Sequence, residues 1–179
     1  MIPFLENEFI KLRALEPEDL DVLYAWENDS ELWSSGNTLS PYSKFALREY
    51  LSEARQDIYH TKQLRLMIEL KDENRAIGTI DLYEFDPMNL RAGVGILLDK
   101  EFRKMGLGTQ VLDLIQAYAF GFLFLKQLYA YIPQSNEASQ NLFLKSSYVC
   151  TGKFQEWIRN SKGFEDVLLM QLKSENFIF

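Results

Sequence analysis

Apolar residues recur along the chain in two spacings. Short alternating or continuous runs rich in β-branched, leucine and aromatic residues predict strands, and polar turns separate these runs. The predicted strands are Glu8–Leu15, Leu64–Leu70, Ala76–Phe85, Arg91–Leu98, Gln127–Pro133, Tyr148–Ile158 and Phe164–Lys173. Polar turns at Lys71–Arg75 and Asn160–Gly163 join neighbouring strands.

Helical spacing accounts for most of the remaining apolar residues. The first helix begins at Glu16-Pro17, because proline and acidic residues suit a helix N-terminus; its predicted buried face is Leu20, Leu23, Tyr24 and Trp26. A second helix begins at Ser40-Pro41, with serine as its cap, and carries a stripe of Leu47, Leu51, Ala54 and Ile58. Further helices are predicted over Gly108–Leu125 and Asn136–Ser146.

The order of these elements predicts a mixed α/β fold. A strand and two helices come first, followed by three strands, a helix, a strand, a helix and two strands. The chain has 179 residues, 47% of them apolar, which suffices for one sizeable core. Because no repeat, low-complexity tract or linker-like composition interrupts the pattern, we expect a single domain over residues 1–179.

The chain is acidic, with a formal net charge of −7 and a sequence pI near 4.8. A phosphate backbone would meet repulsion over most of such a surface, so nucleic acid is disfavoured as a partner. A small cation is the natural partner instead.

Cysteine and histidine each occur once, at Cys150 and His60. An internal disulfide and a multi-His or CxxC metal site are therefore excluded. A Ser–His or Cys–His nucleophile would depend on His60 alone. Because Cys150 sits in a strand-like run with no adjacent base, we expect a buried structural thiol there.

The sequence carries no membrane or secretion signal. The opening MIPFLENEF lacks the basic, apolar and small-residue order of a signal peptide. The longest apolar stretch, Tyr118–Leu125, is too short to cross a bilayer. We therefore expect a soluble cytoplasmic protein.

A glycine loop follows one of the predicted strands. Val94–Gln110 reads VGILLDKEFRKMGLGTQ, an apolar run and a polar bend followed by Arg103-x-x-Gly106-x-Gly108 at the start of a helix. Such a loop directs several backbone N–H groups at one spot beside the positive end of a helix, and this geometry binds phosphate. The loop fits neither the P-loop nor the Rossmann glycine spacing, which disfavours a nucleotide triphosphatase or a dinucleotide oxidoreductase. The motif by itself leaves a structural turn open as well.

Three longer segments carry a family resemblance. They are Ala92–Leu112, Asn136-Glu137-Ala138-Ser139-x-x-Leu142-Phe143 and the terminal FQEWIRNSKGFEDVLLM, and Lys11–Leu20 extends the likeness to nearly the whole chain. Together they resemble the GNAT superfamily of acetyl-CoA-dependent N-acetyltransferases, in the style of the spermidine/spermine and ribosomal-protein branch. The resemblance implies a mixed, centrally antiparallel sheet with flanking helices, in which Arg91–Leu98 and the parallel strand Gln127–Pro133 splay apart.

The resemblance also implies acetyl-CoA as cosubstrate, with its pantetheine arm between the two splayed strands and no metal. Leu97 and Leu98 would offer main-chain groups to pantetheine. Backbone N–H groups of the glycine loop would hold the pyrophosphate; the loop residues are Arg103, Lys104, Met105, Gly106, Leu107, Gly108 and Thr109. Arg103 and Lys104 either add charge there or are solvated. Asn136 matches the family asparagine near the thioester and also suits a helix N-cap.

Transfer of an acetyl group to an amine requires a neutral amine, yet primary amines are mostly protonated at pH 7. Three acidic residues lie near the end of the predicted strand Ala76–Phe85, namely Asp81, Glu84 and Asp86. The resemblance implies Glu84 as base or ammonium anchor, and an exposed loop acid is the alternative. A second acidic group, Glu27, Asp29 and Glu31, lies where the family builds its acceptor wall, or it forms a solvated surface.

Phe143 departs from the family pattern, in which N-x-x-A-x-x-L-Y places a tyrosine as general acid. Phenylalanine cannot donate a proton, and a positioned acid contributes about 10²–10⁴ in rate. Either Tyr131 or Tyr148 supplies the hydroxyl, or the thiolate leaves unprotonated, or activity is slow or lost. Phe143 itself would pack against the cofactor or the core.

The resulting hypothesis is an enzyme that moves an acetyl group from acetyl-CoA directly to a primary amine. A polyamine is favoured because it suits an acidic protein. A peptide or ribosomal-protein N-terminus is the next acceptor, and an antibiotic or amino-sugar amine the third. Phe143 keeps a non-catalytic CoA-binding module open. Exposed aromatic residues near Trp26, Trp33 and Trp157 would serve a homo-oligomeric interface.

Overall fold

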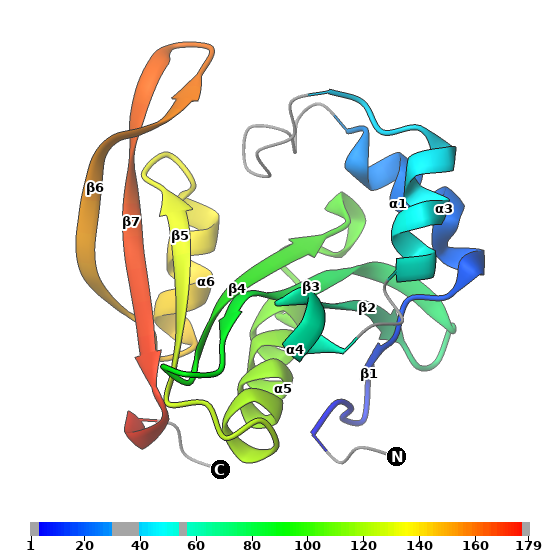
Figure 1. Ribbon diagram of the computed structural model, residues 1–179, viewed down its shortest axis with the longest axis horizontal. Coiled ribbons are helices and arrows are strands. Elements are labelled where there is room, and N and C mark those ends of the chain that lie inside the picture. Colours follow the sequence, from blue (N-terminus) through cyan, green and yellow to red (C-terminus); the bar gives the residue numbers. More distant parts are fainter. Residues whose placement is uncertain (1–3, 30–39, 54–56, 177–179) are drawn as a thin grey trace.

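The computed structural model describes residues 4–29, 40–53 and 57–176. Within these ranges seven strands form one sheet: β1 (Ile10–Arg13), β2 (Leu64–Leu70), β3 (Arg75–Asp86), β4 (Arg91–Leu98), β5 (Gln127–Pro133), β6 (Val149–Asn160) and β7 (Gly163–Lys173). Their order is β1-β2-β3-β4-β5-β7-β6 (Figure 1). Neighbouring strands run antiparallel, except that β4 and β5 run parallel. The predicted mixed, centrally antiparallel sheet is confirmed.

The described helices are α1 (Leu20–Glu27), α3 (Lys44–Glu53), α4 (Ile58–Thr61), α5 (Leu107–Gly121) and α6 (Glu137–Lys145). Short 3-10 turns occupy Pro17–Asp19, Lys100–Phe102 and Ser174–Asn176. Together with the strands, they follow the order that the apolar pattern predicts, except that α3 and α4 replace one predicted helix.

Helices cover both faces of the sheet, as the alternation along β2 demonstrates. Leu66 and Ile68 belong to the large core beneath α5, whereas Met67 between them packs with Leu23 and Trp26 of α1. Figure 1 shows α5 along one face with α6 beside it, and α1 against α3 on the N-terminal half of the molecule. Over β5 and β7, the face opposite α5 carries no helix among the described residues, so side chains there reach solvent.

The core gains most of its helical contribution from α5. Val111, Leu112, Ile115 and Ala119 recur at helical spacing and are all 0% exposed. They belong to the same buried cluster as Leu128 of β5. This packing fixes the start of α5, and with it the glycine loop, against the parallel strands.

The end of α5 lies earlier than predicted. The helix stops at Gly121 rather than at Leu125, because Phe124 adopts a left-handed backbone with φ of 54°. The Leu125 N–H then donates to the carbonyl of Ala119 at 2.9 Å, which turns the chain back toward β5.

On the first helix, only part of the predicted buried face is buried, and the second helix begins later than predicted. Leu23 and Trp26 of α1 are buried, but Tyr24 is 37% exposed and Leu20 is only half-buried. Ser40 is not the cap of the second helix. The Ser43 hydroxyl accepts from the Ala46 N–H at 3.0 Å, so α3 begins three residues later than the sequence suggested.

The single helix predicted from Ser40 onward is two helices. Leu47 is buried on α3, whereas Ile58 lies on the separate helix α4. That helix begins anew because the Asp57 carboxylate accepts from the N–H groups of Tyr59 and His60. Ala54, predicted on the shared stripe, lies outside the described residues.

Cys150 is exposed, so the prediction of a buried thiol is wrong. It lies on β6, the last strand of the sheet order, where one strand edge and much of one face meet solvent. A register shift between Cys150 and Gly152 disturbs the alternation that the apolar run suggested.

The parallel pair β4 and β5 diverges after a short start. The pairs are Arg91 with Gln127, Ala92 with Leu128 and Gly93 with Tyr129, although β4 continues to Leu98 and β5 to Pro133. Residues 94–98 and 130–133 are thus two arms, which we call the β4–β5 fork. Figure 1 shows the two strands leaving adjacent positions in different directions. The predicted splay is confirmed.

Candidate active site

The fork presents two strand edges that have no strand partner across it. Backbone N–H and C=O groups require hydrogen-bond partners, and an extended ligand can pair with such an edge as an added strand does. Pantetheine is extended and carries two amide groups. The fork therefore fits the tail of the predicted cosubstrate. Leu97 and Leu98 are the last two residues of the β4 arm.

The glycine loop lies at the tip of the β4 arm and opens α5. Gly106 is the N-cap residue of α5 and has φ of 76°, a left-handed backbone that favours glycine. Glycine supplies no side chain to cap the helix, and the first N–H groups of an α-helix have no partner within it. A diphosphate at this helix start would meet those N–H groups and the positive end of the helix dipole.

In the glycine loop, one side chain anchors the loop and others are exposed to solvent. Arg103 Nε donates to the carbonyl of Leu98 at 2.9 Å, which ties the loop to the β4 arm. Lys104 and Met105 are exposed, and Thr109 is half-buried. These side chains surround the helix start without closing it.

Leu107 and Gly108 face the interior instead. Leu107 is 9% exposed and belongs to the main core. A Cβ atom at Gly108 would lie 3.1 Å from the side chain of Leu142 on α6, so this glycine allows α5 and α6 to approach closely. The two glycines of the motif therefore act differently, Gly106 through its backbone angle and Gly108 through packing.

Asn136 lies just beyond the β5 arm and caps α6. Its Oδ1 accepts from the Ser139 N–H at 3.1 Å, which confirms the N-cap role. Phe143 of α6 is 3% exposed and packs edge-on against Tyr148, with ring centroids 4.9 Å apart. Of the two packing partners expected for Phe143, the structure shows the core.

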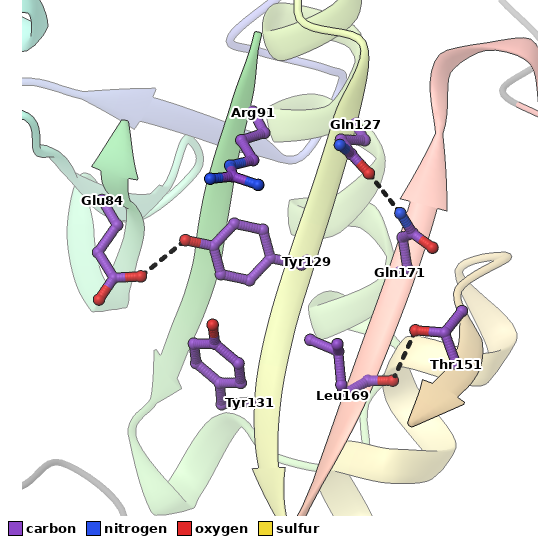
Figure 2. Close-up of a pocket in the computed structure, with 8 residues that line it drawn as sticks. All are labelled: Glu84, Arg91, Gln127, Tyr129, Tyr131, Thr151, Leu169 and Gln171. Atoms are coloured by element: carbon purple, nitrogen blue, oxygen red, sulfur yellow. Dashed lines mark hydrogen bonds between the residues drawn. The ribbon is translucent and has the colours of Figure 1, made fainter. Parts of the chain in front are cut away.

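A pocket of about 290 Å³ opens on the uncovered face of the sheet, beside the fork. Eight residues from β3 to β7 line it: Glu84, Arg91, Gln127, Tyr129, Tyr131, Thr151, Leu169 and Gln171. Figure 2 shows Glu84 and the two tyrosines converging over β4 and β5, with the Tyr129 hydroxyl directed at the Glu84 carboxylate. The Tyr129 hydroxyl donates to Glu84 Oε2 at 2.7 Å.

The backbone at Glu84 explains how this carboxylate reaches the pocket. Glu84 has φ of 49°, and the register between β3 and β4 shifts between Tyr83 and Asp86. A bulge of this kind re-aims a side chain away from strict strand alternation. The sequence placed Glu84 near a strand end, but only the bulge places it in the pocket.

Both pocket tyrosines remain protonated near neutral pH. Burial raises the pKa of Tyr129, and its hydrogen bond to the Glu84 carboxylate raises that pKa further. Burial and the charge of Glu84 likewise raise the pKa of Tyr131. These hydroxyls therefore act as hydrogen-bond donors and not as phenolates. Tyr131 is 42% exposed, whereas Tyr148, the other hydroxyl considered, is 1% exposed.

The remaining acidic candidates are held in ion pairs. Arg65 Nε lies 2.7 Å from Asp81 Oδ1, and Arg65 Nη1 lies 2.8 Å from Glu27 Oε1. Asp86 Oδ2 lies 3.2 Å from Arg91 Nη2. Among the three acids near the end of β3, Glu84 alone lines the pocket.

Other residues singled out by the sequence lie away from the pocket. Asp29 pairs with Lys100 at 3.1 Å. Trp26 is buried and donates to Asp99 Oδ2 at 3.1 Å, so it is not one of the exposed aromatic residues. Trp157 is 60% exposed. Glu31 and Trp33 lie outside the described residues.

Sequence reasoning missed Tyr129, Arg91 and the two glutamines of the pocket. The alternation of β5 carried the signal, because Gln127, Tyr129 and Tyr131 share one face while Leu128 is buried on the other. That face becomes informative only when the uncovered side of the sheet is known.

Comparison with known families agrees with this geometry. Residues 10–148 match the acetyltransferase (GNAT) domain, well over half of the chain. The chain belongs to the GNAT family. It is therefore an N-acetyltransferase, and acetyl-CoA is the acetyl donor of that family.

Curated proteins related to this GNAT chain include characterised and uncharacterised enzymes. It is 26% identical over 147 residues to the spermidine N(1)-acetyltransferase of Escherichia coli strain K12. The aligned region covers 80% of this chain and 75% of that protein. It is 24% identical over 161 residues to the uncharacterised N-acetyltransferase YoaA of Bacillus subtilis strain 168, covering 88% and 89%.

Solved structures share the GNAT fold over nearly the whole chain. The spermidine N-acetyltransferase of Vibrio cholerae in complex with CoA and spermine matches with a TM-score of 0.85 and 23% identity, covering 95% of this chain and 98% of that one. A dodecameric structure of the same enzyme matches with a TM-score of 0.78 and 22% identity, covering 94% and 96%. At these identities the likeness establishes the fold.

None of the helices in the described ranges is long and apolar enough to span a membrane. In the same ranges, no three His, Cys, Asp or Glu side chains gather as a metal site requires.

Proposed function

We propose that this GNAT enzyme acetylates a primary amine of a polyamine by direct transfer from acetyl-CoA. The observation that supports this most is the Glu84 carboxylate, which lies beside the fork with the hydroxyls of Tyr129 and Tyr131. A carboxylate with aromatic rings around it binds an alkylammonium group through charge and cation–π contact. The name of the Escherichia coli relative points to the same acceptor class.

The cosubstrate would occupy the fork and the glycine loop. Main-chain groups of Leu97 and Leu98 would pair with pantetheine, and the N–H groups of residues 103–109 would bind the pyrophosphate. The exposed side chains of Arg103 and Lys104 would lie near the same phosphates. Asn136, at the tip of the β5 arm, would approach the thioester end. The donor then lies on the α5 side of the sheet and the amine enters from the uncovered face.

In the reaction, Glu84 anchors the incoming ammonium group and accepts one of its protons, directly or through water, which leaves a neutral nitrogen. That nitrogen attacks the thioester carbonyl carbon, so a C–N bond forms and the C–S bond breaks. The nitrogen then loses a second proton to become an amide, and the departing CoA thiolate takes up a proton. Because Phe143 carries no hydroxyl, Tyr131 is the accessible phenol that supplies a hydrogen bond or a proton there.

A thiol-release assay with acetyl-CoA tests the proposal, using spermidine, spermine, short diamines and peptides with free N-termini as acceptors. We expect turnover with polyamines, and Glu84→Gln should lower kcat/KM for the polyamine by about 10²-fold or more. Glu73→Gln, which changes an exposed acid in the β2–β3 turn, is the matched control and should retain full activity.

The other outcomes identify the alternatives. Turnover of peptides without polyamines would replace the acceptor class. CoA binding without thiol release from any amine would favour the non-catalytic module that Phe143 suggested. If Tyr131→Phe lowers kcat and Tyr148→Phe does not, the accessible phenol is the one that acts.

We also propose that the protein self-associates. Trp157 and Phe164 of the β6–β7 hairpin are 60% and 67% exposed, which is an aromatic surface suited to a second copy. A dodecameric relative supports assembly in this family. Light scattering coupled to size exclusion gives the mass, and a monomer at micromolar concentration would refute the proposal.

A further inference from the structure

Tyr83 lies at the base of the fork. It is a β3 residue that pairs with Gly93 on β4, and Gly93 pairs in turn with Tyr129 on β5. This row is the last in which all three strands are joined. Beyond it, β4 and β5 have no further pairs.

The Tyr83 ring lies directly over Gly93. A Cβ atom built on Gly93 would stand 2.2 Å from Cε2 and 2.4 Å from Cζ of that ring. The ring therefore occupies the position that a side chain at residue 93 would take. From there it meets the Tyr129 ring edge-on, with centroids 6.1 Å apart and planes at 85°. The aromatic side chain of a β3 residue thus crosses β4 and reaches β5.

Tyr83 is thus the β3 side chain that spans the sheet at the row where the β4–β5 pairing ends.

We propose that Tyr83 is a positioning residue that holds the fork open, its ring acting as a wedge over Gly93 and against Tyr129. This inference rests on the proposed placement of acetyl-CoA in the fork. Neither arm contains a proline before Pro133, so every residue there keeps the N–H group that continued parallel pairing would use. A wedge at the base of the fork explains why pairing stops there, and it preserves the strand edges that pantetheine would use.

A purely structural role is the competing explanation, in which the ring only fills the hollow above a glycine. The two explanations differ in what Gly93→Ala does. If Tyr83 sets the fork, an added methyl displaces the ring and narrows or distorts the fork, so acetyl-CoA affinity falls. If the ring is filler, the variant loses stability and the folded fraction binds acetyl-CoA as before.

The test measures the acetyl-CoA dissociation constant by isothermal titration calorimetry, which needs no acceptor. We expect Gly93→Ala to weaken binding at least tenfold. The matched control is Gly152→Ala on β6, outside the fork, where an added Cβ atom would meet nothing within 4 Å. That control should bind within twofold of the wild type.

A second variant guards against a simple folding defect. Tyr83→Ala combined with Gly93→Ala removes the collision, so the double variant should fold better than Gly93→Ala alone and yet still bind acetyl-CoA at least tenfold more weakly than the wild type, because the wedge is gone. Full recovery of affinity in the double variant would overturn the wedge.

Tyr83→Phe keeps the ring over Gly93 and removes only the hydroxyl. Acetyl-CoA affinity should therefore stay within threefold of the wild type, and a tenfold loss would show that the ring alone does not hold the fork. If no amine is turned over, these binding results still decide the role of Tyr83; if no variant and no wild type binds acetyl-CoA, the proposed function fails instead.

Discussion

Gly106→Ala separates the backbone role of the glycine loop from its binding role. Gly106 has φ of 76°, and a Cβ atom there would meet nothing within 4 Å. The methyl group therefore encounters no protein atom, and its effect on the free protein comes from the left-handed backbone alone. In the complex, the same methyl group would project where the diphosphate must approach the first N–H groups of α5.

The magnitudes follow from these two terms. An alanine in left-handed conformation costs about 1 kcal/mol, which for a chain of this size lowers Tm by about 2–4 °C. With CoA at a hundredfold over its dissociation constant, the wild type gains about 2.7 kcal/mol, or a rise in Tm of about 5–11 °C. Tenfold weaker binding leaves about 1.4 kcal/mol at the same CoA concentration, so the rise is roughly halved.

Differential scanning fluorimetry with and without CoA measures both effects. The matched control is Gly163→Ala in the β6–β7 turn, where φ is 126° and a Cβ atom also meets nothing within 4 Å. Both variants should lower the Tm of the free protein. Only Gly106→Ala should reduce the rise in Tm that CoA produces.

An equal CoA-induced rise in Tm in the wild type, Gly106→Ala and Gly163→Ala would refute the pyrophosphate assignment. The loop would then be a structural turn, the alternative that the sequence left open. A reduced rise in both variants would indicate instead that backbone strain affects the whole fold.

Three further predictions concern stability. Ile115→Ala, at a site 0% exposed, should lower the free energy of unfolding by about 2–5 kcal/mol in urea titrations, and a loss under 1 kcal/mol would contradict the packing of α5 on the sheet. Arg65→Met should lower it by about 3 kcal/mol, because it strands the carboxylates of Glu27 and Asp81 without their shared partner, and adding Asp81→Asn should restore part of that loss. Burial raises the pKa of Asp19, but hydrogen bonds from Arg13 and from the Glu16 N–H outweigh it and hold the pKa below 3.8. Since the unfolded chain binds this proton at higher pH, Asp19 stabilises the fold above pH 3.8 and loses that contribution as pH falls below it. Asp19→Asn should therefore flatten the acid limb of stability against pH, and an unchanged limb would contradict this.

The elements of the fold were accessible from local patterns. Apolar spacing located the strands and α5, and the glycines at 106 and 108 located the loop that opens this helix. These features depend on neighbours a few residues away, so a linear pattern encodes them. Boundaries were less accessible, because Ser40 and Ser43 are both suitable N-cap residues and composition does not show that the Ser43 hydroxyl accepts from the Ala46 N–H.

Some features of the candidate site were likewise visible in the local sequence, and others depended on the folded structure. Glu84 stood out as an acid near a strand end, but its arrival in the pocket depends on a bulge set by pairing with β4. Tyr129 and Arg91 were missed because their importance depends on which face of the sheet is left uncovered. Cys150 was misjudged because the sequence does not reveal that β6 is the last strand of the sheet.

The sequence by itself determined most of the secondary-structure elements, their order and the position of the glycine loop that opens α5, since each follows from spacing and backbone preference over a few residues. Tertiary structure alone decided the register, the bulge at Glu84, the row at which the β4–β5 pairing ends and the contact of Tyr83 with Gly93. Those depend on pairing between segments far apart in the chain, and a shift of one residue in any strand would reverse which side chains face the pocket.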